Sequence, residues 1–383
     1  MSTTTTRTRW SGVAGSAAST VTRYGFVAAF ALLVVFFSFA SDAFLRPSNL
    51  LNVLDGVAIL LLVALALTVV VSSGGIDLSA AVAVDFGAWF AIVSMMSFGM
   101  PWPVAVLLGL LGGALIGALN AFLIVGLGVT PFLATLGTFF IGRSAQQIGT
   151  NGGASVSFRA APEGFTFLGS GDVLGVGIPV IIAAVAAVGV GILLHRTPAG
   201  VRIQAMGLQD RAAVVAGLRT RRIRVLVYVG AGVLCAAGGV LLSASLRLYT
   251  PLAGFSYLLD AIAAVFIGAS MHPRSRPNVP GTVVGVLFLG VLANGLDLLG
   301  LDFNVKAAVQ GVVLLVALVL AYTVAQRARA AAERKPAAKG AGSSAPAPTG
   351  PAAPAVAATD DAASNGRRAT TTPPSDTTPG GPV

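Results

Sequence analysis

Residues 196–224 read RTPAGVRIQAMGLQDRAAVVAGLRTRRIR and separate two long apolar stretches of the chain. This segment holds seven arginines and one acid, whereas 55% of the 383-residue chain is hydrophobic and only 10% is charged. A cluster of arginines between apolar spans marks the cytoplasmic side of a membrane. The segment therefore predicts an all-α, polytopic membrane protein with this loop in the cytoplasm.

The same segment carries a pattern besides its charge. It contains Thr197-Pro-Ala-Gly-Val-Arg-Ile-Gln-Ala-Met-Gly207, then Asp210-Arg-Ala-Ala213 and Gly217-Leu218. A loop that only sets orientation needs basic residues alone. The pattern therefore indicates a surface for a cytoplasmic partner, and it favours a transport machine over a self-contained enzyme.

The composition excludes several other classes of protein. The net charge of +10 does not indicate nucleic-acid binding, because the basic residues gather in loops and termini beside apolar spans. Cys235 is the only cysteine, so no intrachain disulfide or cysteine metal site is expected. Two histidines, His195 and His272, are too few for a zinc or di-iron centre. We expect neither a metal nor a bound cofactor.

About ten segments are apolar and long enough to cross a bilayer, which takes about 20 residues. They are 24–41, 56–73, 79–98, 102–125, 129–148, 173–195, 225–246, 258–271, 281–299 and 304–325. With both termini in the cytoplasm, the cytoplasmic segments hold 19 of the 24 Lys and Arg residues. Segment 24–41 resembles a signal peptide, but its removal would put basic segments on the wrong side. We therefore expect it to be retained.

The ends of the chain differ from its middle. Residues 1–22 are basic and rich in Ser and Thr, and 336–383 contain no Leu, Ile, Met or aromatic residue. Neither end can bury a core, so both are predicted to be disordered. Residues 23–326 form the predicted transmembrane domain, with 196–224 as a cytoplasmic loop within it.

Two halves of the transmembrane domain repeat weakly. Asp77 opens the third span and Asp260 opens the eighth, each followed by a similar apolar run. Asn120 and Asn294 match at an offset of 174 residues, and so do nearby glycines. The first set starts at the predicted cytoplasmic face and the second at the outer face. This is the pattern of an inverted repeat, with spans two to five against spans seven to ten.

Polar residues in or beside the spans have two interpretations. In Ser72-Ser-Gly-Gly-Ile-Asp-Leu-Ser79, Asp77 or Ser79 could cap the next helix, or the break could belong to a discontinuous helix lining a translocation path. Asp85, Arg143 and Asp260 should face protein or water. Arg143 could pair with either acid, or these groups could hydrogen-bond a sugar in a pore.

The chain lacks the sequence of an ATP-hydrolysing subunit. It contains no G-x-x-x-x-G-K-[ST] motif, and its three lysines are Lys306, Lys335 and Lys339. It also lacks a nucleophile–base constellation. We expect it not to be an enzyme, so any ATP is hydrolysed by a separate subunit.

Four blocks in order resemble the permease subunits of bacterial ABC sugar importers of the ribose/xylose type, over roughly residues 45–325. They are Gly74-Gly-Ile-Asp-Leu-Ser79; Asn120-Ala-Phe-Leu-Ile-Val with Thr130-Pro-Phe-Leu-Ala-Thr-Leu-Gly137; Thr197–Gly217; and Leu259–Gly268 with Gly281-Thr and Asn294-Gly-Leu. The loop 269–280 departs from the family, because prolines and arginines replace its usual glycines. This departure puts the partner contact of that loop in doubt.

The resemblance implies a mechanism and its residues. A solute-binding protein delivers a monosaccharide or polyol, two permease copies form the pore in the cell membrane, and docked ATPase subunits drive alternating access. A small helix over Ala205–Leu218, ending at Gly207 and Gly217, would couple to the ATPase. The implied coupling residues are Gly200, Arg202, Ala205, Gly207, Asp210, Ala212, Ala213 and Gly217. The implied substrate-pathway residues are Gly74, Gly75, Asp77, Ser79, Asn120, Thr135, Asp260 and Asn294.

Three alternatives stay open at this point. The same architecture could carry nucleosides or branched-chain amino acids, since the pore residues are generic. An ion-coupled secondary transporter could use Asp77, Arg143 and Asp260 as a relay, but the patterned loop would then be unexplained. A membrane structural or signalling protein is the third, but it would leave the broken helix and the intramembrane acids unexplained. Separately, the arginines of the loop could only set the topology and contact lipid phosphates.

Overall fold

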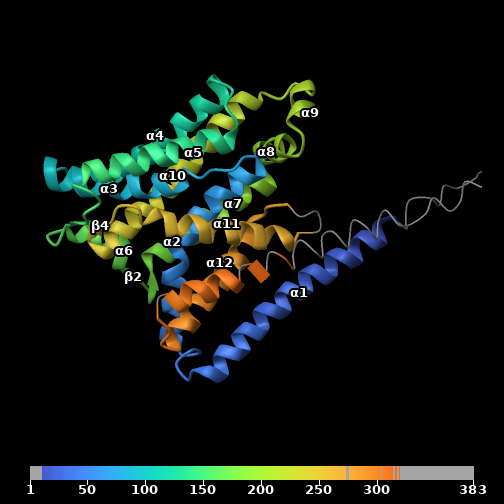
Figure 1. The fold of residues 1–383 in the computed structure, drawn as a ribbon, viewed down its shortest axis with the longest axis horizontal. Coiled ribbons are helices and arrows are strands. Elements are labelled where there is room, and N and C mark those ends of the chain that lie inside the picture. The colour runs from blue at the N-terminus through green and yellow to red at the C-terminus, as the bar shows by residue number, and fades with distance from the viewer. Residues whose placement is uncertain (1–10, 273–275, 303, 314, 317–318, 320–383) are drawn as a thin grey trace, which may run out of the picture. The chain divides into compact units, whose positions relative to one another are not determined.

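A computed structural model describes residues 11–272, 276–302, 304–313, 315–316 and 319. The described residues are almost entirely helical, as the sequence predicts (Figure 1). The predicted C-terminal tail 336–383 lies outside them.

The long helices occur in the order in which the apolar segments were predicted. They are α1 (Ser11–Ala40), α2 (Pro47–Ser72), α3 (Ala80–Phe98), α4 (Trp102–Ala121), α5 (Pro131–Gly149), α7 (Ile178–Arg196), α10 (Thr220–Leu246), α11 (Gly254–Ser270) and α12 (Val279–Leu298). A π-helical turn, η1 (Phe122–Gly126), extends α4, and α6 (Glu163–Ser170), α8 (Pro198–Leu208) and α9 (Asp210–Val215) are short. Two antiparallel pairs join β1 (Val156–Ser157) to β4 (Leu248–Tyr249) and β2 (Asp172–Val173) to β3 (Val176–Gly177).

Six of the described helices are long and apolar enough to cross a membrane, and two shorter apolar helices accompany them. The six are α2, α3, α4 with η1, α7, α10 and α12; the shorter ones are Phe26–Ala40 and α11. Two further predicted spans coincide with α5, which carries Arg143 and two glutamines, and with helical residues from 304 onward. The all-α, multi-pass prediction is confirmed. Backbone helix in α1 begins at Ser11, before the predicted boundary at residue 22.

Helix α2 forms the centre of the largest apolar cluster. Val63, Ala64, Leu65 and Ala66 are all completely buried, so every side of the helix is covered at this level. A helix that is apolar all round is stable only where protein or lipid surrounds it, and here protein does so. The next residues after α2, Ser73–Ser79, are not helical; Asp77 and Ser79 among them are buried, whereas Gly74 and Ile76 are exposed.

The two halves of the domain exchange helices. Helix α10 packs against α3 and α4, whereas α2 packs against α11 and α12 (Figure 1). The first helix of each predicted repeat thus lies against the second and third helices of the other. Such an exchange is expected of two halves related by a two-fold axis, and it supports the predicted inverted repeat.

Close contacts between helices depend on glycine. Gly113 in α4 and Gly232 in α10 face each other, and a Cβ on either would collide with the carbonyl oxygen of the other. Small residues at such crossings allow two backbones to approach closely within a membrane.

We expect Gly113→Ala to lower the melting temperature of the detergent-solubilised protein, because overpacking of this crossing costs about 1–3 kcal/mol. Gly189→Ala in α7 is the matched control, since no atom lies within 4 Å of a Cβ there. It should leave the melting temperature unchanged or raise it, because alanine favours helix. Equal melting temperatures for the two variants would contradict the tight α4–α10 contact.

Candidate translocation and coupling sites

The break between α2 and α3 is held by a buried carboxylate. Asp77 Oδ1 accepts hydrogen bonds from the backbone N–H of Ser79 at 2.9 Å and from its hydroxyl at 2.6 Å. Asp77 is 4% exposed and Ser79 is 1% exposed. Burial raises the pKa of the Asp77 carboxyl, and the hydrogen bonds from Ser79 and from the Ala80 backbone partly offset this rise. The carboxylate thus satisfies the first amides of α3, as the capping interpretation requires.

Two further predicted residues complete this cluster. Asn120, near the end of α4, donates from Nδ2 to the hydroxyl of Ser79 at 2.5 Å. Thr135 of α5 donates from Oγ1 to the backbone carbonyl of Ile76 at 3.2 Å. With Gly74 and Gly75, six of the eight predicted pathway residues therefore surround one helix break.

Sequence reasoning missed Tyr228 of α10, which closes the same cluster. A Cβ on Gly75 would collide with the Tyr228 hydroxyl, so a larger residue there would have to displace the tyrosine side chain. Within the described part of the chain, the Tyr228 hydroxyl, Asn120 Oδ1 and Ser72 Oγ are buried without a hydrogen-bond partner. Buried polar atoms of this kind usually bind ordered water. A tyrosine in an otherwise apolar helix is the signal that could have identified it.

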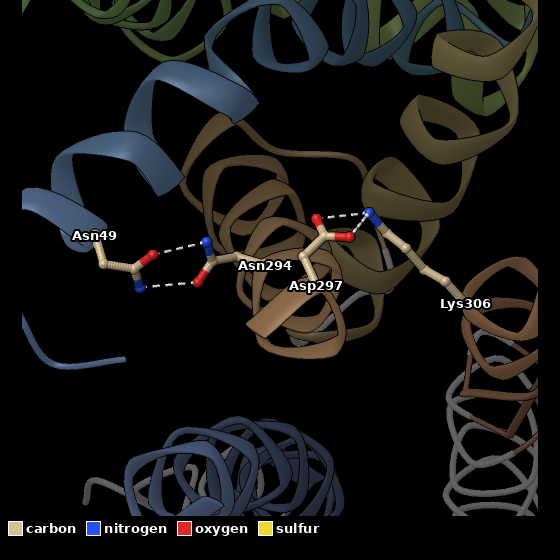
Figure 2. Close-up of polar contacts among 4 residues, drawn as sticks. All are labelled: Asn49, Asn294, Asp297 and Lys306. Carbon is tan, nitrogen blue, oxygen red and sulfur yellow. Dashed lines mark hydrogen bonds and ion pairs between the residues drawn. The ribbon is translucent and has the colours of Figure 1, made fainter. Parts of the chain in front are cut away.

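The other two predicted pathway residues lie elsewhere. Asp260 in α11 accepts a hydrogen bond from Gln310 Nε2 at 3.0 Å. Asn294 in α12 exchanges two amide hydrogen bonds of 2.9 Å with Asn49 at the start of α2 (Figure 2). Asn294 therefore has a structural role in joining α2 to α12.

Two basic residues, Lys306 near Asn294 and Arg143 in α5, differ in whether they form an ion pair. Lys306 forms an ion pair with Asp297 at 2.7 Å, one turn beyond Asn294 (Figure 2). Arg143 forms no ion pair among the described residues, so its suggested pairing with Asp85 or Asp260 is not observed. Asp85 instead accepts a hydrogen bond from the backbone N–H of Gly254 at 2.8 Å.

The arginine-rich loop contains two short helices, not one. The prediction of one continuous helix over Ala205–Leu218 is wrong. Gln209 has an extended backbone (φ −159°, ψ 94°) and separates α8 from α9. The predicted end at Gly217 agrees with the structure, since its φ of +79° places it in the left-handed region after α9. Gly207, in contrast, lies inside α8.

Helix α8 is anchored to the end of α7. The hydroxyl of Thr197 accepts a hydrogen bond from the backbone N–H of Gly200 at 3.2 Å, which caps α8. Gln204 Nε2 donates to the Leu194 carbonyl at 2.9 Å. Gly200 itself packs against the backbone at Leu193, where a Cβ would collide with the carbonyl oxygen. Met206 is buried beneath the helix, with 1% of its surface exposed.

Gly207 joins this loop to the helix break. A Cβ on Gly207 would collide with the carbonyl oxygen of Ser72, and one on Gly74 would lie 3.1 Å from the Gly207 Cα. Gly74 has φ +82°, which favours glycine. The backbones of the two glycines are therefore in direct contact. A movement of α8 would reach the Asp77 cluster through this contact.

Helix α9 presents the predicted coupling surface. Asp210 at its start forms an ion pair with Arg224 of α10 at 3.0 Å, and Ala213 is buried. The side chains of Val214 and Val215 are 54% and 89% exposed. Of the remaining predicted residues, Arg202 and Ala212 are exposed and Ala205 is partly buried.

The glycine-poor loop 269–280 is closed by a side chain in its described part. Asn278 accepts a hydrogen bond at Oδ1 from the backbone N–H of Gly281 at 2.7 Å, capping α12, and donates to the Arg276 carbonyl at 3.0 Å. An asparagine thus provides the turn that glycines would otherwise provide.

We expect Asp77→Asn to remain about as stable as the native protein, because asparagine retains an oxygen acceptor for the α3 amides. Asp77→Ala should lower stability by about 1 kcal/mol, since those amides lose their acceptor. Melting temperatures in detergent measure both variants. An asparagine variant no more stable than the alanine variant would contradict the capping role.

Comparison with known proteins is consistent with this geometry. Residues 49–318 match the family described as branched-chain amino acid transport system / permease component. The chain is 37% identical to the ribose import permease protein RbsC of Bacillus subtilis (strain 168), over 76% of this chain and 89% of that protein. It is 32% identical to RbsC of Escherichia coli (strain K12), over 76% and 90%.

A third relative is named for the import of a different solute. The autoinducer 2 import system permease protein LsrD of Escherichia coli (strain SMS-3-5 / SECEC) is 33% identical, over 78% of this chain and 92% of that protein. No solved structure is significantly similar to the chain. The family match covers most of the transmembrane domain, and these relatives are transport components, not enzymes. The chain therefore belongs to the permease-component family of ABC import systems.

Proposed function

We propose that this chain is the membrane-spanning permease of an ATP-driven importer for a monosaccharide of the ribose class. The observation that carries the proposal is the backbone contact between Gly207 and Gly74, which joins a cytoplasmic loop to a polar break inside the membrane domain. The two RbsC relatives are named as ribose import permeases, which supports a ribose-like substrate. The LsrD relative makes a related polar solute the second candidate.

The partner on the cytoplasmic side is an ABC ATPase subunit, which hydrolyses the ATP. Its docking surface is the exposed side of α9 with Val214 and Val215, beside Arg202 and Arg211. The Asp210–Arg224 ion pair joins the start of α9 to α10. The chain itself binds no cofactor in this proposal.

On the outer side, a solute-binding protein delivers the sugar, and a second copy of the chain completes the pore. Helix α5 carries the exposed Arg143 inside a predicted membrane span, so this part of the helix must meet water or protein rather than lipid. Apolar faces of the other spans meet membrane lipid, and both termini lie in the cytoplasm.

The ion-coupled alternative lacks an assembled relay. Asp77 caps α3, Asp260 accepts a hydrogen bond from Gln310, and Arg143 pairs with neither acid within the described structure. Nucleosides and branched-chain amino acids have no specific support from the three relatives compared.

Purification of the tagged chain from native membranes in mild detergent tests the proposal. A nucleotide-binding protein should be recovered in a stoichiometric amount, and the complex should hydrolyse ATP faster when ribose-loaded binding protein is added. Recovery of the chain alone, under conditions that hold a known ABC complex together, would contradict an ATP-driven importer.

Gly207→Ala should separate ATP hydrolysis from sugar uptake, because the added methyl group collides with Ser72 and alters the α8 contact. Uptake should fall at least tenfold, while the amount of protein in the membrane stays the same. Gly230→Ala is the control, since no atom lies within 4 Å of a Cβ there. Normal uptake by the Gly207 variant would remove this contact from the coupling path.

A further inference from the structure

A cavity of about 390 Å³ lies between α3, α5 and the segment that joins β4 to α11. Three polar side chains line it: Asp85 from α3, and Arg143 and Gln146 from α5. Asp85 is 2% exposed and Gln146 is completely buried. In the predicted topology the wall of the cavity includes the first turns of α3, near the cytoplasmic side, and the outer ends of α5 and α11, so the cavity lies along the import path. Its size suits a small ligand.

The orientation of Gln146 is fixed by two donors. Its Oε1 accepts hydrogen bonds from the Tyr249 hydroxyl and from the Leu252 backbone N–H, both at 3.0 Å. Burial raises the pKa of Tyr249, and the nearby Asp85 carboxylate raises it further, so the phenol stays protonated and donates. With Oε1 occupied, Nε2 is left as a buried donor without a hydrogen bond among the described residues, and the Asp85 carboxylate is its near neighbour. A buried donor held in this way is available to a ligand.

Arg143 and Asp85 complete the set of donors and acceptors. The Arg143 side chain is exposed and has no acid partner among the described residues. Asp85 Oδ1 accepts from the Gly254 backbone N–H, and the Asp85 carboxylate lines the cavity beside Gln146. A guanidinium, a carboxylate and an amide together can donate to and accept from neighbouring hydroxyl groups.

Aromatic rings provide the apolar part of the wall. Phe139, Phe140 and Phe255 line the cavity. The rings of Phe139 and Phe255 lie 5.9 Å apart, tilted by 39°. Apolar walls with a few placed polar groups are typical of small-molecule sites. A sugar has both surfaces, with C–H groups on its ring faces and hydroxyls around its edge.

We propose that this cavity is a sugar-binding subsite on the import path, in which Arg143, Asp85 and Gln146 hydrogen-bond the hydroxyls of a pentose-sized sugar. The inference rests on the proposed function. It adds selection by the permease itself to selection by the binding protein. None of these three residues belongs to the Asp77 cluster at the α2–α3 break.

The test compares ribose uptake with ATP hydrolysis in proteoliposomes that contain the assembled transporter and its binding protein. Arg143→Gln should lower ribose uptake about tenfold through the loss of hydrogen bonds to the sugar. ATP hydrolysis stimulated by loaded binding protein should stay within about twofold of the native rate, since coupling is intact. Arg159→Gln, an exposed arginine on the same predicted side that does not line the cavity, should change neither.

The outcomes separate the two proposals. A native transporter that hydrolyses ATP but carries no ribose-class sugar would overturn the proposed substrate, and the sugar subsite with it. Native uptake that Arg143→Gln leaves unchanged, or a parallel fall of uptake and ATP hydrolysis, would overturn the subsite alone.

A second measurement does not depend on transport. Phe140→Cys places a thiol in the cavity wall, and the native Cys235 is buried, so background labelling is low. Ribose at high concentration should slow the reaction of this thiol with a membrane-impermeant maleimide at least fivefold, whereas sucrose should not. Equal rates with and without ribose would overturn the subsite.

Discussion

The requirement that every buried backbone amide finds a partner controls this structure at the break between α2 and α3. Seven residues leave the helical conformation there, and four of them are buried, where no bulk water is available to their polar groups. Asp77, Ser79 and Asn120 solve this problem with side chains. The break also has to accept the backbone of Gly207. One short segment therefore combines helix termination, a polar cluster and contact with the cytoplasmic loop.

Much of this arrangement follows from the sequence. Apolar length located the spans, and arginine density identified 196–224 as a loop. Glycine and aspartate marked the α2–α3 break, because these residues end helices and cap the next ones. Six of the eight predicted pathway residues lie at this break, since the spacing in one motif keeps four of them together.

Contacts between distant segments could not be predicted in the same way. Nothing local indicates that Gly207 faces Gly74 or that Tyr228 faces Gly75, because both contacts depend on how α8 and α10 pack. The break at Gln209 was missed since neither glycine nor proline marks it. Nor could the sequence indicate that Asn294 pairs with Asn49, because this contact depends on how α12 packs against the start of α2.

Two polar contacts at the end of α12, Asn49–Asn294 and Asp297–Lys306, respond differently to acid and salt in the surrounding medium. The Asn49–Asn294 pair carries no charge, so neither acid nor salt alters its two hydrogen bonds directly. The Asp297–Lys306 pair is charged and partly exposed, so added salt screens it. In the predicted topology both face the environment outside the cell. The junction of α2 with α12 should therefore keep its geometry when the acidity and salinity outside the cell vary, whereas the Asp297–Lys306 contact weakens as salt rises.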